Sequence, residues 1–389
     1  MTLAGSYNRV RTYVCTHGMA ATAAEITRRA ARRARLGAVP ASVHVEISNV
    51  CNLNCEYCVL DNHTTGDRVM GEDTFAAVLP SLRDACRIDV SGIAEPLMNT
   101  RWASIVARMR AAAPHARIAM CSNATLLTRA AAEALVDWTL DELTFSLDGV
   151  DPDAVDEVRH GGSFSAMLDN VRTLQAVKTE RGSDRPALSA TVVLRRSNAR
   201  QLPAIVALAA KLGVSAVNVN GLEPYAPHLV DECVWTDPER GSYLPDILEE
   251  AEGAARRGGL TLRLTAMRPS APVCPQVHRP IVLADGSVVP CSVLAYERRS
   301  LLSVTGHGEV VRRDAITPRL SFGSVKERPL AEVWASPAYR RFRGAVSRGE
   351  FPDACQTCLL KHGVVCPSPP LTVAECLRTV PQQTVPGSG

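Results

Sequence analysis

Three cysteines, Cys51, Cys55 and Cys58, stand close together with the spacing C-x3-C-x2-C. Three thiolates within eight residues can ligate three irons of a [4Fe–4S] cluster and leave the fourth iron without a protein ligand. An incompletely ligated metal can bind a cofactor or substrate, as the open position of a catalytic zinc does. A structural zinc with His63 as its fourth ligand is the alternative, although such sites more often use paired C-x2-C sequences.

A second group of cysteines lies in the last third of the chain and comprises Cys274, Cys291, Cys355, Cys358, Cys366 and Cys376. The first two flank a predicted hairpin, and the next two form a C-x2-C pair. These four thiolates can converge and ligate every iron of one cluster, which would then transfer electrons. Alternatively, the last four hold one cluster while the first two anchor an incompletely ligated one. A structural zinc is again possible.

Four further residues are candidates for direct roles in catalysis. Cys121 and Cys233 lie near predicted strand ends, where a thiol could donate a hydrogen atom to a substrate radical. The alternative for both is packing, because most free cysteines are small buried hydrophobic residues. Glu223 and Tyr225 follow the sixth predicted strand. They are candidates to bind a polar substrate, since a binding pocket needs a few well-placed polar groups.

The elements that position these residues alternate between short apolar runs and helical patterns. The predicted strands are Val43–Ser48, Ile88–Ser91, Ile118–Ser122, Leu143–Leu147, Leu188–Leu194 and Ala216–Asn220. The predicted helices are Asp73–Cys86, Trp102–Ala113, Arg129–Trp138, Phe164–Thr179 and Pro203–Leu212. This order predicts an α/β fold whose parallel sheet forms a partial (βα)6 TIM-like barrel or a doubly wound sheet. Chemistry in such folds collects at the carboxyl ends of the strands, where the first cysteines lie.

The same pattern divides the chain into five segments. Residues 1–41 form a predicted helical extension, 42–221 the (βα)6 core, 222–270 a connecting segment, 271–378 a cysteine-rich α+β domain, and 379–389 a disordered tail. In the cysteine-rich domain we expect a β-hairpin that turns at Asp285-Gly286 and a helix over Pro329–Gly349.

The composition excludes several classes of protein. A net charge of +3 over 389 residues, with 4% aromatic residues, supplies neither the basic surplus nor the stacking rings of a nucleic-acid-binding protein. No stretch approaches the roughly 20 apolar residues of a membrane span, and the N-terminus lacks a secretory signal. Thirteen cysteines, an odd number, do not suit a secreted disulfide scaffold. We therefore expect a cytoplasmic protein that uses metal or redox chemistry and has no membrane or nucleic-acid partner.

At the first cysteine motif the chain resembles the radical S-adenosylmethionine (SAM) superfamily, and the resemblance covers roughly residues 42–221. The positions that match SAM-binding segments of this family are Tyr57, Gly92, Glu95, Ser122, Asn123, Ser146 and Arg159. The resemblance implies that the open iron is chelated by the amino and carboxylate groups of SAM. Reductive cleavage of SAM then gives a 5′-deoxyadenosyl radical, which abstracts hydrogen from an unactivated carbon.

Residues 270–380 resemble the SPASM and shorter twitch extensions of radical SAM enzymes, which carry auxiliary [4Fe–4S] clusters. The C-x9–15-G-x4-C element is present, whereas the downstream spacing C-x2-C-x7-C-x9-C departs from the SPASM pattern. The resemblance implies one or two auxiliary clusters as electron relays and a flavodoxin- or ferredoxin-type reductant.

The expected reaction is oxidation or epimerisation of a small polar substrate, such as a sugar, an aminocyclitol or a nucleoside-like intermediate of antibiotic biosynthesis. Only 42 residues precede Val43, too few for the leader-binding domain that many peptide-modifying members carry. The alternative is a maturase that modifies a ribosomal peptide or a sulfatase-type protein.

Overall fold

The computed structural model describes residues 39–59, 68–237, 239–264, 272, 274, 276–304 and 310–362. The predicted tail, most of the predicted N-terminal extension, and His63, Cys366 and Cys376 lie outside these residues. Within the described part, no helix combines the length and the apolar character that crossing a membrane requires.

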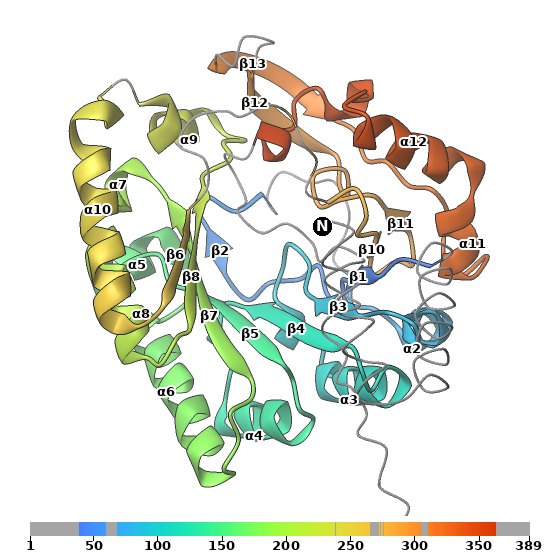
Figure 1. The fold of residues 1–389 in the computed structure, drawn as a ribbon, viewed down its shortest axis with the longest axis horizontal. Helices are drawn as coiled ribbons and strands as arrows, with labels where there is room; N and C mark the ends of the chain where they lie inside the picture. Colours follow the sequence, from blue (N-terminus) through green and yellow to red (C-terminus); the bar gives the residue numbers. More distant parts are fainter. Residues whose placement is uncertain are drawn as a thin grey trace, which may run out of the picture.

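A curved sheet of nine strands forms the centre of the molecule (Figure 1). Its six predicted parallel strands are β1 (Ser42–Val45), β3 (Arg87–Val90), β4 (Arg117–Ser122), β5 (Glu142–Ser146), β7 (Ala187–Leu194) and β8 (Ala216–Gly221). The crossover helices on its convex side are α2 (Glu72–Val78), α3 (Trp102–Ala112), α4 (Arg129–Asp137), α6 (Phe164–Glu180) and α8 (Leu202–Lys211). Short helices after the strands are α5 (Pro152–Val158), α7 (Arg196–Ala199) and α9 (Pro227–Asp231). The predicted parallel α/β core is therefore confirmed.

The two faces of this sheet differ in polarity because side chains alternate along each strand. Val45 and Val90 are fully buried against the crossover helices in the main hydrophobic core. The opposite, inner face carries polar side chains. In the register of the strands, one row on it consists of Glu46, Ser91, Cys121, Thr144 and Ser189, and the next of Ser146, Thr191, Asn218 and Arg263. A polar ligand can therefore be received on the inner face without burying unpaired polar groups.

The βα pattern continues beyond the six expected units. Helix α10 (Arg240–Gly258) leads into β9 (Thr261–Leu264), which pairs parallel to β8. Leu244, Ile247 and Ala251 of α10 are buried in the main core. Their spacing was hidden in the sequence by the many Glu and Arg residues between them. The predicted boundary at residue 221 therefore falls inside the sheet.

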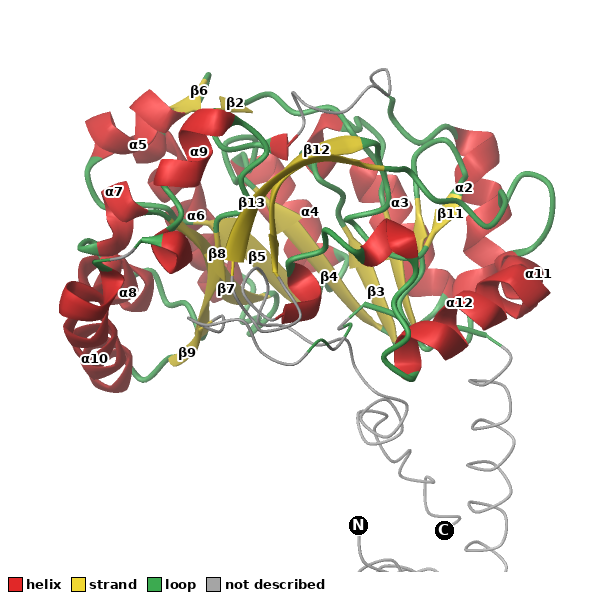
Figure 2. Ribbon diagram, turned by 90° about the horizontal axis from the view of Figure 1, so that it is seen from above, coloured by secondary structure: helices red, strands yellow, loops and turns green. Residues whose placement is uncertain are grey.

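The C-terminal domain begins with the predicted hairpin, formed by β10 (Ile281–Val282) and β11 (Val288–Val289). Gly286 in its turn has φ +92°, a conformation that favours glycine. Strand β10 also pairs parallel to β1, so the two domains share one sheet. A second hairpin, β12 (Arg298–Val304) with β13 (Val310–Thr317), lies across the open side of the sheet (Figures 1 and 2).

Two predicted helices are interrupted by proline. The segment Pro329–Gly349 forms α11 (Leu330–Ala335) and α12 (Pro337–Ser347), because Pro337 lacks the N–H that a continuous helix needs. The Ser336 hydroxyl caps the second helix by accepting from the Tyr339 N–H at 3.3 Å. Helix α2 likewise ends at Val78, where a 3₁₀ turn over Leu79–Leu82 contains a proline.

Candidate active site and auxiliary thiol set

The loop after β1 brings the three predicted cluster ligands onto one tight turn. Strand β2 (Asn54–Cys55) pairs with β6 (Arg159–His160), which sets Cys55 opposite Arg159. The Cys58 N–H donates to the Cys55 carbonyl at 2.9 Å. Cys51, Cys55 and Cys58 are all half-buried. The loop therefore carries all three thiols within eight residues, and none of them is fully buried.

The Cys51 sulfur accepts hydrogen bonds from the Leu53 N–H at 3.4 Å and from Asn123 Nδ2 at 3.7 Å. Burial raises the pKa of the Cys51 thiol, whereas both hydrogen bonds lower it. Donors to sulfur stabilise a thiolate, the form that ligates metal. Asn123, predicted to bind SAM, therefore also contacts a predicted iron ligand.

The donor set matches the ligands of an iron–sulfur cluster. Among the described residues, no three His, Cys, Asp or Glu side chains are placed to hold a single metal ion, and His63 of the zinc alternative lies outside those residues. Three thiolates suit a [4Fe–4S] cluster. Cys51, Cys55 and Cys58 would hold it, with one iron left open.

Glu95 lies between the cysteine loop and the end of β4 and is buried. Its Oε1 accepts from the Leu97 N–H at 3.0 Å and the Ser122 hydroxyl at 2.9 Å, and its Oε2 accepts from the Asn123 N–H at 2.7 Å. Burial raises the pKa of Glu95, while these donors lower it. An ionised carboxylate has about four acceptor positions, so one remains for an ammonium group. Ser122 acts here as a support of Glu95.

Gly92 is fixed by a buried carboxylate that the sequence did not reveal. A Cβ at Gly92 would lie 2.5 Å from Cγ of Glu46, so a larger residue does not fit. Glu46 accepts from the Tyr296 hydroxyl at 2.5 Å and from the Ala284 N–H at 3.3 Å. Burial raises the pKa of Glu46 to about 7. A family-like glycine is thus in contact with a residue that connects both domains.

A buried network surrounds Tyr57. Its hydroxyl donates to Asp148 Oδ2 at 2.6 Å, and Arg159 Nε donates to the Tyr57 oxygen at 2.9 Å. Arg159 Nη2 forms an ion pair with Asp148 Oδ2 at 2.6 Å, and Asp148 Oδ1 accepts from the Val193 N–H at 2.7 Å. The guanidinium of Arg195 lies 4.7 Å from the centroid of the Tyr57 ring. The network fixes both the aromatic ring and the Arg159 cation beside the cysteine loop.

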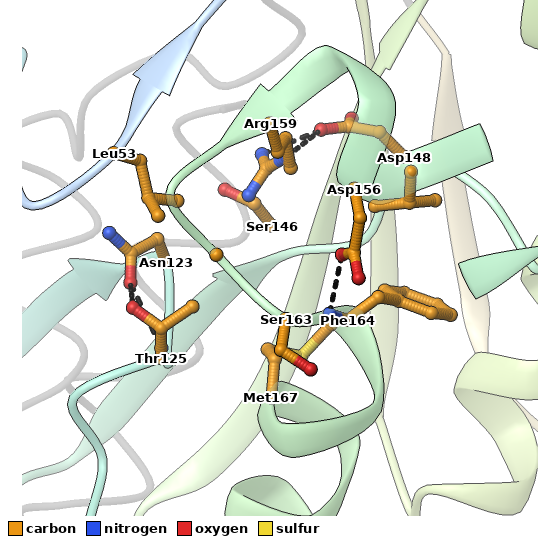
Figure 3. Close-up of a pocket in the computed structure, with 12 residues that line it drawn as sticks. Leu53, Asn123, Thr125, Ser146, Asp148, Asp156, Arg159, Ser163, Phe164 and Met167 are labelled. Atoms are coloured by element: carbon orange, nitrogen blue, oxygen red, sulfur yellow. Dashed lines mark hydrogen bonds and ion pairs between the residues drawn. The ribbon is translucent and has the colours of Figure 1, made fainter. Parts of the chain in front are cut away.

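A pocket opens beside this network at the carboxyl ends of β4 and β5 (Figure 3). Asn123, Ser146 and Arg159, three of the predicted SAM-binding residues, line it together with Leu53 and Asp148. Residues far apart in the sequence therefore meet at one pocket.

The second thiol set is formed by Cys274, Cys291, Cys355 and Cys358. Burial raises the pKa of Cys291, and the thiols of Cys358, Cys274 and Cys355 raise it further. Burial also raises the pKa of Cys355 to about 11 and that of Cys358 to about 12, again with contributions from neighbouring thiols. The four thiols thus lie within electrostatic range of one another. One cluster ligated by these four residues is compatible with this proximity, and the alternative set includes Cys366 and Cys376, which lie outside the described part.

The predicted substrate residues lie in different environments. Glu223 forms an ion pair with Arg298 of β12 at 2.7 Å and thereby joins the two domains. Tyr225 and Cys233 are buried in a second hydrophobic cluster, which also contains Tyr57. Cys121 lies on the inner face of the sheet, where burial raises the pKa of its thiol to about 12.

Cys233 is engaged with the backbone. Its sulfur donates to the carbonyls of Leu229 at 3.4 Å and Leu222 at 3.6 Å. This is the environment of a packed thiol, the alternative that the sequence left open.

Three residues of the site were not singled out from the sequence. Asp148 lies two residues after Ser146, which the resemblance had identified. The signal in the sequence was therefore an acidic residue at the end of a predicted strand. Glu46 and Arg195 gave no signal, because their partners Tyr296 and Tyr57 are distant in the sequence.

Comparison with known proteins agrees with this geometry. Residues 45–209 match the radical SAM superfamily, and residues 274–359 match the iron–sulfur cluster-binding SPASM domain. The cofactor-modifying protein of tungsten-containing aldehyde ferredoxin oxidoreductase from Pyrococcus furiosus is 27% identical over 330 residues, covering 82% of this chain and 87% of that protein.

The PqqA peptide cyclase of Methylorubrum populi is 26% identical over 332 residues, covering 82% of this chain and 77% of the cyclase. Among solved structures, Streptococcus suis SuiB bound to S-adenosylmethionine superposes with a TM-score of 0.57 at 13% identity, covering 88% of this chain and 76% of SuiB. This likeness supports the fold.

The chain therefore contains a radical SAM domain. More narrowly, this domain is followed by a C-terminal SPASM domain. The two domains imply a [4Fe–4S] cluster, SAM and auxiliary iron–sulfur ligation, as predicted.

Proposed function

We propose that this chain is a peptide-modifying radical SAM oxidoreductase, which removes hydrogen from a carbon of a peptide residue. The observation that carries the proposal is the similarity to PqqA peptide cyclases, which extends over 82% of the chain. Those relatives do not support the predicted small polar substrate, nor its dehydrogenation or epimerisation. They favour the alternative, a peptide or protein substrate.

The chain's own residues would determine where the chemistry takes place. When bound, the cluster and SAM supply a one-electron route to hydrogen abstraction from an unactivated carbon. Asp148 and Tyr57 hold the Arg159 guanidinium in a fixed position, so this cation needs no reorganisation to contact a bound anion. Glu95 keeps one acceptor position for an ammonium group. Together these groups would orient SAM over the open iron.

The inner face of the sheet suits an uncharged polar substrate such as a peptide backbone. The Thr144 and Ser189 hydroxyls pair at 2.7 Å, and Asn220 Nδ2 donates to the Thr191 hydroxyl at 2.9 Å. Among the described residues, Oδ1 of Asn220 is buried and has no partner. It is therefore an acceptor ready for the N–H of a substrate amide.

The four-thiol set would complete the reaction. Loss of a hydrogen atom, followed by loss of an electron and a proton, is a two-electron oxidation. A cluster ligated by Cys274, Cys291, Cys355 and Cys358 has no open iron and is suited to accept the electron. A flavodoxin- or ferredoxin-type protein is the proposed donor of the electron that cleaves SAM.

The test uses the anaerobically reconstituted full chain with SAM and dithionite, and peptides encoded beside its gene as candidate substrates. Mass spectrometry should show a peptide that has lost two hydrogen atoms, with 5′-deoxyadenosine formed in at least equal amount. A peptide labelled with deuterium at the reacting carbon should transfer the label to 5′-deoxyadenosine. Unchanged peptides, together with label transfer from a sugar or aminocyclitol, would overturn the proposal in favour of the small-molecule reaction.

A further inference from the structure

Tyr339 of α12 is a fully buried phenol, with 0% of its surface exposed. Among the described residues, its hydroxyl oxygen has no hydrogen-bond partner. A buried hydroxyl without a partner is destabilising, and phenylalanine would fill the same space without that cost. The Tyr339 hydroxyl is therefore a donor for which the described residues supply no acceptor.

The ring of Tyr339 is held on several sides, so its hydroxyl has one direction. Phe322 stacks on it with the ring centroids 4.2 Å apart and the planes at 8°. Trp334 meets it edge-on at 5.1 Å, and the Arg343 guanidinium lies 4.7 Å from its centroid. A phenol enclosed in this way cannot turn towards another partner.

Tyr339 is connected to Cys291, one of the four thiols of the second set, through Phe322 and strand β11. The Phe322 N–H donates to the carbonyl of Val288 at 2.9 Å, which ties Phe322, and with it Tyr339, to strand β11. That strand leads directly to Cys291. Burial raises the pKa of Tyr339, Arg343 lowers it, and the thiols of Cys291 and Cys274 raise it again. The phenol is therefore within electrostatic range of two auxiliary ligands.

We propose that Tyr339 donates a hydrogen bond to a sulfur atom of the auxiliary cluster, either a sulfide or the thiolate of Cys291 or Cys274, and thereby raises the reduction potential of that cluster. Reduction adds negative charge to the cluster, so a donor to sulfur stabilises the reduced form more than the oxidised form. Tyr339 is thus a positioning residue that makes the cluster a better electron acceptor. This role is independent of which substrate the enzyme modifies.

The test is an EPR-monitored redox titration of the reconstituted full chain with the substitution Tyr339→Phe. Its background carries Cys51→Ala, Cys55→Ala and Cys58→Ala, so that only the auxiliary signal is observed. The midpoint potential should shift to a more negative value while the iron content stays unchanged. The coupling of an exchangeable proton to the reduced cluster, measured by ENDOR before and after exchange into D2O, should be lost.

Tyr243→Phe is the matched control. Tyr243 is a residue of α10, at the opposite end of the sheet from α12 (Figure 1), and its hydroxyl donates to Asp237 at 2.6 Å. This variant should leave both the potential and the proton coupling as they are. An unchanged potential and coupling in Tyr339→Phe with full iron content would overturn the proposal.

A second variant keeps the test decisive if Tyr339→Phe loses iron. With 3-fluorotyrosine incorporated at position 339, the ring keeps its shape but the phenol is a stronger donor. The midpoint potential should then shift to a more positive value. No shift would show that the hydroxyl of Tyr339 does not contact the cluster.

Discussion

The two thiol sets of this molecule lie in contrasting surroundings. Cys51, Cys55 and Cys58 occupy a loop at the edge of the polar inner face, where the amide of Asn123 and the cation of Arg159 stand beside them. The second set lies near an aromatic group that contains Tyr339. The three-cysteine set thus has polar groups beside it that could hold a cofactor, whereas the four-thiol set has aromatic residues on one side and Lys361, whose Nζ donates to the Cys355 carbonyl at 2.9 Å, on another.

Substitution Cys51→Ala should have the largest effect, because it removes a ligand from the set that has none to spare. We expect the iron content to fall by about four per chain and 5′-deoxyadenosine formation to stop. Iron and sulfide analysis with a dithionite-driven SAM cleavage assay checks this. Retained SAM cleavage would contradict the assignment of the open iron to this loop.

Substitution Cys358→Ala addresses the other set. The iron content should again fall by about four per chain, but SAM cleavage should persist, since the first set is intact. Oxidised product should be lost because the surplus electron has no acceptor. The measurement is the amount of 5′-deoxyadenosine formed per product. If Cys358→Ala behaves like Cys51→Ala in both assays, the functional contrast between the sets is wrong.

The network beneath the first set should contribute strongly to stability. Asp148→Ala leaves the buried Arg159 cation without its ion pair, and removing one partner of a buried pair costs about 3–5 kcal/mol. Urea unfolding of the reconstituted protein under anaerobic conditions measures the loss. The control is Asp169→Ala, which breaks an exposed pair with Arg172 and should cost less than about 1 kcal/mol. Equal losses of unfolding free energy in the two variants would show that Asp148 does not stabilise a buried network.

The smallest expected effect concerns Glu46, which lies between the two domains. Its pKa in the folded chain is about 7, above the ordinary value of 4.5, because of burial. Between these values the folded state binds the proton more tightly than the unfolded state, so stability falls as the pH rises. From pH 6 to pH 8 this loss is about 1 kcal/mol. In Glu46→Gln the loss should disappear, and parallel pH profiles of the unfolding free energy for the two proteins would contradict this.

The core strands and the first thiol set could be predicted from the sequence, because both depend on local signals. In Val43–Ser48 and Ile118–Ser122 the alternate residues are apolar, and these are buried in the main core against the helices. The spacing of Cys51, Cys55 and Cys58 requires no tertiary contact to be recognised. Helix α10 was not predicted because charged Glu and Arg residues stand between its buried residues and obscure their spacing.

Other features depend on contacts between distant segments. Tyr339 acquires its role only when Phe322 and the auxiliary thiols surround it, and Glu46 only when Tyr296 reaches it. No spacing along the chain encodes these contacts. The break at Ser336-Pro337, by contrast, was missed although a local signal was present, since proline after a serine is a frequent start of a new helix.

Strand β10 pairs with β1 only a few residues before Cys51, and the same hairpin leads into Cys291. The backbone hydrogen bonds of one sheet therefore connect the two proposed cluster sites. Electron tunnelling rates decay steeply with distance, so a rigid spacing fixes how fast an electron can pass between them. A sheet shared by two domains thus keeps the distance between the two proposed cluster sites constant. A flexible linker between independent domains would let that distance vary.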